Sequence, residues 1–386
     1  MSRSAAGPDG VRTSGDVLGT PVRPSRRRLA LAIGGAVTAL LLAGCGPLGY
    51  YAQSVGGHLA ILHAARPVPE VLQDATLSEG LRRKLTLAQH IRRYASDRLA
   101  LPDNRSYTAY ADLHRAAAVW NVVAAPAYSL QLKTWCYPVA GCVGYRGYYD
   151  EAEAQAGGAR QRAEGLEAAV YPVPAYSTLG WLNWLGGDPL LSTFIGYPDG
   201  ELARIVFHEL AHQRFYVSGD TVFNESYATA VERLGSAQWL RDEADEPARE
   251  AYARFDQRRR QMQALMLATR EALARAYGSP AAKAGDWAQV EAMKQSAMRE
   301  FRERYAQLRA GWPADGRQGA YDAWVARANN ATFGAQAAYD QLVPQFEQLF
   351  ARCNGDWARF HAEVERIGRL PTHEARVAAL ASAPAP

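Results

Sequence analysis

Apolar residues recur at helical spacing over most of the chain. Within residues 79–100 they stand three or four positions apart, and residues 150–167 are rich in alanine, glutamate and arginine. From Gly200 onward the pattern is helical almost to the end. Residues 238–276 and 287–309 alternate charged and apolar positions, which is typical of two long helices that form a hairpin. Helices therefore dominate the expected structure.

Strand character is confined to the part of the chain before Gly200. The segments rich in β-branched and aromatic residues are 119–123, 128–135, 144–149 and 170–179. Two prolines in the last segment favour an edge strand, because proline donates no hydrogen bond to a neighbouring strand. We therefore predict a helix-rich α+β fold, with a small β-containing N-terminal part and a long helical C-terminal part.

A basic and apolar leader precedes the predicted globular part. Three arginines at 26–28 are followed by an apolar run that ends in Leu-Ala-Gly before Cys45. The run is too short for a membrane span but suits a signal peptide. Its end resembles the bacterial lipobox, in which the cysteine is lipidated and becomes the mature N-terminus, and Gly46 after it favours the outer membrane, facing the periplasm. An ordinary secretory peptide with a chance cysteine is the alternative.

The leader also accounts for the positive charge of the chain. Residues 1–44 hold six of the 43 basic residues and two of the 39 acidic ones, which leaves 37 of each in the remainder. A neutral remainder offers no basic surface, so we expect no nucleic-acid partner.

Two cysteines lie close together after the predicted leader. Cys136 and Cys142 are separated by five residues that include a proline and a glycine, which suit a turn. In an oxidising compartment this spacing predicts a small-loop disulfide. Two thiols of a metal site are the alternative, but no second cysteine pair is present to complete such a site.

The candidate chemistry lies in the string Ile-Val-Phe-His-Glu-Leu-Ala-His at 205–212. Two histidines four positions apart project from one face of a helix, so His208 and His212 can bind the same Zn²⁺. Glu209 is the candidate general base, because it lies beside the first histidine and can take a proton from a zinc-bound water. Two surface histidines on a helix are the alternative.

A catalytic zinc site needs a third protein ligand. Twelve residues separate His212 from Glu225, which falls in the first turn of the next predicted helix. The Asn224-Glu225 segment resembles the gluzincin arrangement, in which a glutamate completes a site of two histidines and one glutamate. Glu225 could instead interact only with the helix dipole, and Glu232 could be an outer partner of the site or a solvated charge.

The resemblance extends beyond the zinc segment. The lipobox with residues 46–51, the segment 175–181, His208 to His212, the segment 224–229, and Asn329-Asn330-Ala331 with Tyr339 and Val343-Pro344 together resemble the bacterial family of predicted aminopeptidases, lipoproteins of the gluzincin type. The resemblance covers most of the mature chain. It implies a zincin-like active-site helix, one Zn²⁺ per chain bound by His208, His212 and Glu225, and Glu209 as the base.

Two parts of an aminopeptidase site are harder to identify from the residues. A group that stabilises the oxyanion is expected, and Tyr339 is favoured over Tyr227, Tyr176 and Asn330 because it lies in the resembling C-terminal segment. The acids that would bind the substrate's amino group are not evident, since the segment 176–180 contains none. It could still bind an extended peptide as an edge strand.

These features lead to one principal hypothesis and one alternative. The principal hypothesis is a zinc peptidase that acts on peptides, anchored to the membrane by lipid on Cys45. The alternative is a non-catalytic envelope lipoprotein with a structural zinc site or a helical partner-binding role; retention of Glu209 argues against it, since a structural site needs no base. The expected organisation is a signal peptide at 1–44, a zincin-like core at 45–236 and a helical part at 237–386. The terminal histidines His361 and His373 are expected on the surface.

Overall fold

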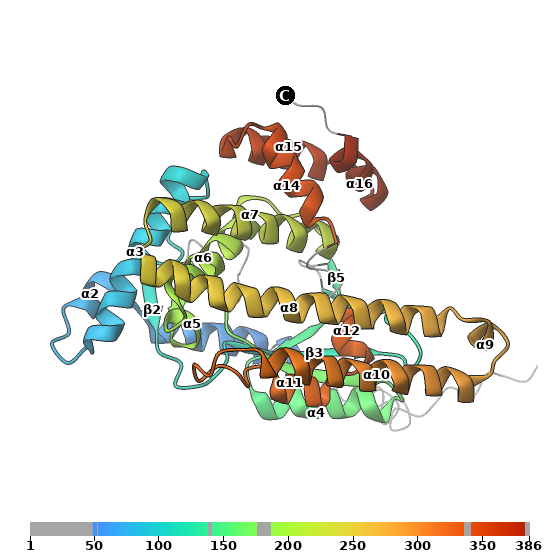
Figure 1. The fold of residues 1–386 in the computed structure, drawn as a ribbon. Coiled ribbons are helices and arrows are strands. Elements are labelled where there is room, and N and C mark those ends of the chain that lie inside the picture. Colours follow the sequence, from blue (N-terminus) through green and yellow to red (C-terminus); the bar gives the residue numbers. More distant parts are fainter. Residues whose placement is uncertain (1–48, 52, 138–140, 176–186, 336–340, 383–386) are drawn as a thin grey trace, which may run out of the picture. The chain divides into compact units, whose positions relative to one another are not determined.

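The computed structural model describes residues 49–51, 53–137, 141–175, 187–335 and 341–382. They divide into two compact units, Met1–Ala52 and Gln53–Pro386, of which the second holds the labelled helices and strands of Figure 1. The leader with Cys45, and also Tyr176 and Tyr339, lie outside the described residues. In the described part of the chain, no helix is both long enough and apolar enough to cross a membrane.

Helices make up most of the second unit, as the sequence predicts. Residues 53–64 are helical. The labelled helices are α2 (Val68–Leu72), α3 (Glu79–Leu99), α4 (Glu151–Ala163), α5 (Ser192–Ile195), α6 (Asp199–Arg214), α7 (Thr221–Asp242), α8 (Glu246–Tyr277), α9 (Pro280–Lys283), α10 (Trp287–Ala310), α11 (Asp322–Arg327), α12 (Asn330–Ala335), α14 (Val343–Arg352), α15 (Trp357–Gly368) and α16 (His373–Ser382). The helix-rich α+β prediction is confirmed.

Within the described residues, the strands are short and form three small sheets. They are β1 (Ala65–Pro67), β2 (Ala109–Ala111), β3 (Val119–Ala125), β4 (Trp135–Tyr137), β5 (Gly141–Val143), β6 (Arg146–Tyr148), β7 (Glu167–Val173) and β8 (Leu190–Leu191). The sheet orders are β1-β2-β8, β6-β3-β7 and β4-β5, and the second sheet is antiparallel throughout. The fully buried β3 lies at its centre, and β7 lies at its edge, where its proline is tolerated.

One predicted strand is wrong. Residues 126–134 lie outside the strands, and only Trp135 of the segment 128–135 enters β4. The reason is that side chains of helices bind this backbone: Lys294 donates to the carbonyl of Ala127, and the amide of Asn330 donates to the same oxygen. Tyr128 stacks on Trp287 of α10, with ring centroids 5.2 Å apart. The aromatic character of the segment therefore reflects packing against the long helices and not strand pairing.

Helix α4 covers the central sheet at close range, and its glycines make this possible. It contacts both β3 and β7. A Cβ atom at Gly157 would lie 2.8 Å from the hydroxyl of Tyr148, and one at Gly158 would lie 2.8 Å from a methyl group of Val170. Neither distance is possible for a real side chain, so the two glycines set how closely the helix approaches the sheet.

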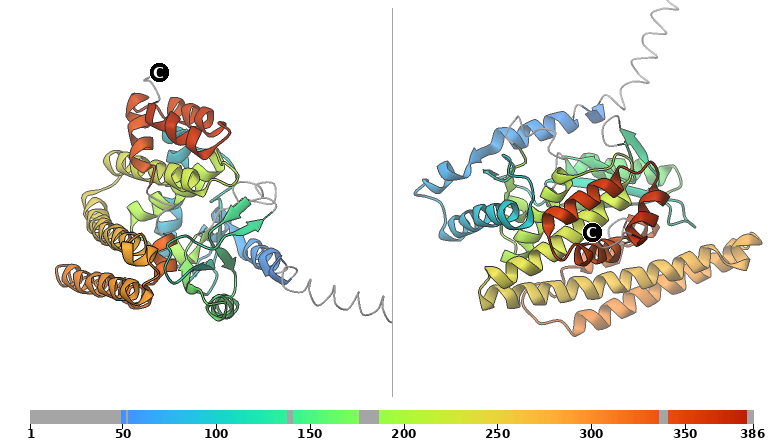
Figure 2. Two further views of the ribbon diagram at one scale, coloured as in Figure 1. Left: turned by 90° about the vertical axis from the view of Figure 1, so that its right-hand side faces the viewer. Right: turned by 90° about the horizontal axis from the view of Figure 1, so that it is seen from above.

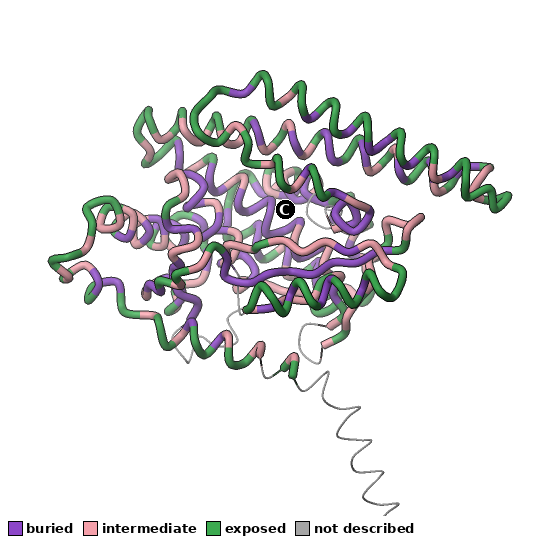
Figure 3. Tube along the Cα trace, turned by 90° about the horizontal axis from the view of Figure 1, so that it is seen from below, coloured by how far each residue is buried: buried purple, intermediate pink, exposed green. Residues whose placement is uncertain are grey.

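The hydrophobic core has two main parts. The larger one gathers residues from the N-terminal helices, α6, α7 and the three C-terminal helices. The smaller one lies between α8, α10, α11 and α12. Figure 1 shows α8 and α10 as a long hairpin joined through α9, and Figure 2 shows it from two further directions. In Figure 3 this hairpin alternates buried and exposed positions, as an amphipathic pair should.

The C-terminal helices belong to the same compact unit as the rest. The expected boundary after residue 236 falls inside α7, and α14 packs directly on α7.

The expectation that His361 lies on the surface is wrong, because its exposed fraction is 1%. Its Nε2 donates to the carbonyl of Leu99 and its Nδ1 accepts from the hydroxyl of Tyr227, both at 2.9 Å. His373 is half-buried and bonded to Asp220.

Candidate metal centre

The candidate site is built on the antiparallel helices α6 and α7. Asn224 holds the short loop between them in place. Its side-chain amide donates to the carbonyl of Val217 at 2.7 Å and accepts from the N–H of Val217 at 2.8 Å. Gly219 supplies a backbone φ of +79°, and Asp220 caps α7 by accepting from the N–H of Phe223. This tight return brings the start of α7 against the histidine face of α6.

Three side chains converge there. The Nε2 atoms of His208 and His212 are 3.2 Å apart. The Oε2 atom of Glu225 lies 3.4 Å from Nε2 of His208 and 3.6 Å from Nε2 of His212. Within the described residues, these three form the group of histidine and carboxylate side chains able to hold a metal ion. The sequence predicted all three members of this group.

The triangle has the size that a tetrahedral metal requires. Zinc binds nitrogen and oxygen at about 2.0–2.1 Å, so two ligand atoms of a tetrahedral ion stand about 3.3 Å apart. The observed separations of 3.2, 3.4 and 3.6 Å bracket this value. Three protein ligands also leave a fourth position for water or substrate. The residues present therefore fit a metal ion of this kind.

Glu232 proves to be an outer partner of the group. Its exposed side-chain fraction is 4%, and the Nδ1–H of His208 donates to its Oε2 at 2.8 Å. Its other oxygen accepts from Arg204 at 2.6 Å and from Arg259 at 3.3 Å. Burial alone would raise the pKa of Glu232, but Arg204 and His208 hold it well below its usual value. Such a carboxylate fixes the tautomer and orientation of a ligating histidine.

The carboxyl groups of Glu209 and Glu225 differ in the direction in which their pKa values are shifted. Burial raises the pKa of the Glu209 carboxyl above its usual value, against the opposing charges of His208 and His212. Burial also acts on Glu225, but the two histidines overcome it and lower its pKa to about 2. Glu225 is therefore ionised and suited to a cation, whereas Glu209 is held in a less polar setting beside it.

Three tyrosines near this group were missed in the sequence. Tyr216 lies against His212, with ring centroids 6.4 Å apart. Tyr145 retains an exposed fraction of 37%; burial first, and then the charge of Glu225, raises the pKa of its phenol. Burial also raises the pKa of Tyr171, which is bonded to Asn121. No spacing signal points to Tyr145 or Tyr171, because Tyr145 lies between β5 and β6 and Tyr171 lies in β7, outside α6 and α7.

Two of the four residues that the sequence offered as oxyanion stabilisers lie within the described part of the chain. Tyr227 is 1% exposed and bonded to His361, and Asn330 is fully buried and accepts from the hydroxyl of Tyr277. Both are structural residues. Tyr176 and Tyr339 lie outside the described residues, so the role suggested for Tyr339 stays a prediction.

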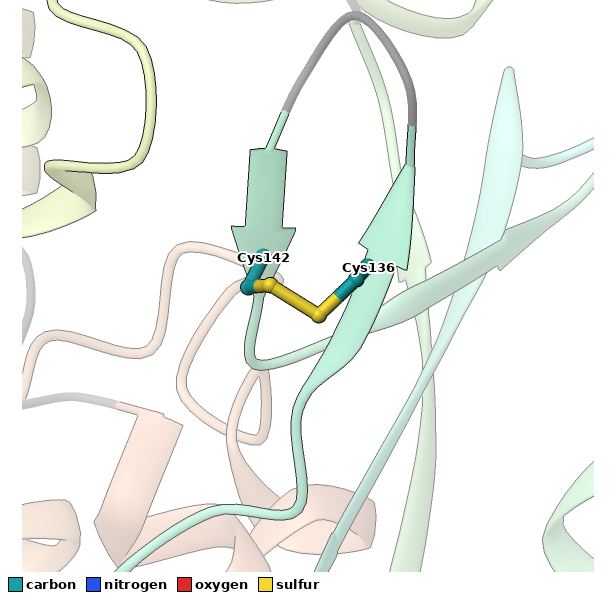
Figure 4. The surroundings of a disulfide bond; sticks show 2 residues. All are labelled: Cys136 and Cys142. Carbon is teal, nitrogen blue, oxygen red and sulfur yellow. A yellow bond between two sulfur atoms is a disulfide. The ribbon is translucent and has the colours of Figure 1, made fainter.

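A disulfide-tied hairpin lies against the loop of the helix pair. Cys136 and Cys142 face each other across β4 and β5 and are joined by a disulfide (Figure 4). A Cβ atom at Gly141 would lie 3.1 Å from the Cα of Gly219, so the hairpin and the α6–α7 loop touch through two glycines. Tyr145 lies two residues after the end of β5, so the contact between the hairpin and this loop brings it toward the start of α7, where Glu225 lies.

A cavity of about 980 Å³ opens beside the group. His208 and Glu209 line it from α6, and residues 168–173 of β7 line it from the sheet. Met262 and Met266 contribute apolar surface from α8. Its volume is in the range of ligand-binding cavities, and its position gives a substrate access to Glu209.

Comparison with protein families matches the chain to the family described as "Putative aminopeptidase", over residues 49–380. Comparisons with curated proteins and with solved structures give no match.

Proposed function

Because the chain belongs to the putative aminopeptidase family, we propose that it is a zinc peptidase of the gluzincin type, with His208, His212 and Glu225 as the zinc ligands. The observation that carries this proposal is the triangle of two Nε2 atoms and one carboxylate oxygen beside Glu209. Zinc bound there would supply a Lewis acid and a water of lowered pKa. The family supports peptidase activity, and the geometry supports the metal-dependent form of it.

Glu209 acts as the general base in this proposal. It lies next to a ligand on α6, lines the cavity and sits in a setting that raises its pKa, which suits a group that accepts a proton and then returns it to the leaving amine. Glu232 takes no part in the proton transfer. It orients His208 through the Nδ1–H bond.

Tyr145 is the described tyrosine best placed to stabilise the oxyanion. Burial first, and then the charges of Glu225 and Glu209, raise the pKa of its phenol, and an O–H donor at such a site can bind the developing negative charge. Tyr339 stays the second candidate for this role.

The chain is proposed to be a lipoprotein whose Cys45 carries the lipid anchor, held at the outer membrane and facing the periplasm. The lipobox-like end of the leader and the disulfide of the hairpin support this. Cys45→Ala should abolish incorporation of labelled fatty acid, and unchanged incorporation would refute the anchor.

A structural zinc site in a non-catalytic lipoprotein is the second candidate function. A structural site is closed by four protein ligands, whereas three converge here among the described residues, and a cavity lined by His208 and Glu209 lies beside them. These two features favour the catalytic form.

The test separates metal binding from chemistry. Glu209→Gln keeps the shape of the side chain but loses the basic oxygen, so the variant should retain about one zinc per chain and lose at least ~100-fold in turnover. Glu225→Ala should lose both zinc and activity. The measurements are elemental analysis and a peptide-cleavage assay on the same preparations. Wild-type turnover in Glu209→Gln would refute the base, and a wild-type protein without zinc after growth in zinc-rich medium would refute the whole proposal.

A further inference from the structure

The cavity beside the candidate metal centre is unusually basic. Its lining includes five arginines and two acidic residues, and the arginines are Arg162, Arg204, Arg233, Arg259 and Arg327. The part of the chain after residue 44 carries equal numbers of acidic and basic residues, so this excess is local. A cavity lined by one sign of charge concentrates ligands of the opposite sign.

Two of these arginines are neutralised by acids. Arg204 donates to Glu201 at 2.8 Å and to Glu232 at 2.6 Å. Arg259 pairs with Asp256 and with Glu232. Both belong to the buried network that holds His208, and they are not available to a ligand.

Two others have no acidic partner in the described part of the chain. Arg162 donates to the carbonyl of Ala168, at 3.4 Å, and Arg327 donates to the carbonyl of Ala323, at 3.1 Å. Neither forms an ion pair with a described residue within 4.0 Å. Both side chains are exposed, so they lie where the cavity meets solvent. Their charge can therefore meet a ligand without breaking an existing ion pair.

The acids of the same lining are already engaged. Glu232 accepts from His208 and the two arginines, and Glu209 is the proposed base. Among the described residues, the lining offers no further carboxylate for an ammonium group. The cavity thus favours a negative group on its ligand over a positive one.

We infer that this cavity binds short acidic peptides, with a carboxylate of the peptide held at Arg162 and Arg327. The inference rests on the proposed peptidase function and names its substrate class. Met262, Met266 and Trp324 of the same lining provide apolar surface for the rest of the peptide.

Helix α7 indicates how far the cavity extends from the candidate metal centre. Glu225, Thr229 and Arg233 lie on one face of this helix, and the last two line the cavity. Eight residues of helix span about 12 Å. An extended chain advances about 3.3 Å per residue, so a peptide of about four residues covers this distance.

Binding without turnover tests the inference. Glu209→Gln protein is titrated by calorimetry with the tetrapeptides Ala-Ala-Glu-Ala and Ala-Ala-Gln-Ala, each as free acid and as C-terminal amide. Arg162→Gln and Arg327→Gln, added singly, should each weaken binding of the acidic peptide by ~3-fold, and together by ~10-fold. Binding of the amide of Ala-Ala-Gln-Ala, which has no carboxylate, should stay the same. Arg275→Gln is the matched control, because this exposed arginine of α8 is outside the lining.

The four peptides identify which carboxylate is bound. A loss on changing Glu to Gln assigns the side chain, and a loss on amidation assigns the C-terminus. Equal binding of all four peptides would overturn the inference, as would an equal loss in Arg275→Gln. Failure of the peptidase proposal is distinguishable: charge-selective binding by a protein that cleaves no peptide refutes only the activity, and cleavage without charge preference refutes only the inference.

Discussion

The helix pairs α6–α7 and α8–α10 are both antiparallel, but they are stabilised in different ways. Ten of the 16 residues of α6 are buried, compared with seven of the 32 residues of α8. Polar groups within the first pair are therefore held in fixed hydrogen bonds, as Glu232 and His208 are. In the second pair, charged groups mostly form exposed pairs one helical turn apart. The side chains of the candidate metal site come from the first pair, whereas the second pair contributes Arg259 to the network around Glu232 and otherwise provides a wall of the cavity.

The sharpest test of this comparison is the same substitution in both pairs. Leu202 of α6 is fully buried, whereas Leu267 of α8 is 37% exposed. Leu202→Ala should lower the free energy of unfolding by about 2–5 kcal/mol because it leaves a cavity. Leu267→Ala should change it by less than about 0.5 kcal/mol. Urea denaturation of both variants measures this, and similar losses would show that the two pairs do not differ.

The next test breaks the fixed polar contact in the buried pair. Glu232→Gln keeps an acceptor for the Nδ1–H of His208 but removes the charge, so zinc affinity should fall about 10- to 100-fold. Competition with a chromophoric chelator measures the affinity, and circular dichroism verifies the fold. Glu271→Gln on the exposed face of α8 is the control. Unchanged affinity in Glu232→Gln would mean that the outer carboxylate does not tune the site.

His361 of α15 is another buried polar residue that is held in fixed hydrogen bonds, one of them to Tyr227 of α7. Burial, despite the bond to Leu99, lowers the pKa of this imidazole from 6.5 to about 4. Between these two pH values the unfolded chain binds more protons than the folded protein, so stability is lost as the pH falls. From pH 7 to pH 5 this loss is about 2 kcal/mol.

Thermal denaturation across this pH range tests the contribution of His361. His361→Gln retains a donor for Leu99 and an acceptor for Tyr227 but does not titrate, so its stability should depend less on pH than that of the wild type. His114→Gln is the control, since the side chain of His114 is 86% exposed. An identical pH profile for His361→Gln and wild type would contradict the assignment.

The same contrast explains what could be predicted from the sequence. The spacing of His208 and His212 lies within one helix, and Glu225 follows after a short loop, so local periodicity was sufficient to find them. Tyr145 reaches the site through the contact between Gly141 and Gly219, which joins elements far apart in the chain. No local pattern encodes such a contact.

The fold, too, has parts that local periodicity predicts and parts that depend on contacts between distant segments. Helix α10 was predicted nearly to its ends, because its burial repeats with the helical period. The predicted helix 238–276 instead begins inside α7 and runs through the break that separates α7 from α8. The segment 128–135 was misread as a strand, since its aromatic residues pack on helices that lie more than 100 positions later. The burial of His361 was missed for the same reason: its partners, Leu99 and Tyr227, come from two other helices.

The smallest change in the free energy of unfolding is expected for an exposed ion pair of the α8–α10 hairpin. Glu300 and Arg304 form an ion pair one turn apart on α10, with 54% and 55% of their side chains exposed. Water and salt screen such a pair, and holding two long side chains in one geometry costs entropy. Glu300→Gln should therefore change the free energy of unfolding by less than about 0.5 kcal/mol, and the change should shrink further in 1 M salt. Urea denaturation at low and high salt measures it. A loss above ~1 kcal/mol would mean that the hairpin, like the metal-site pair, depends on specific polar contacts.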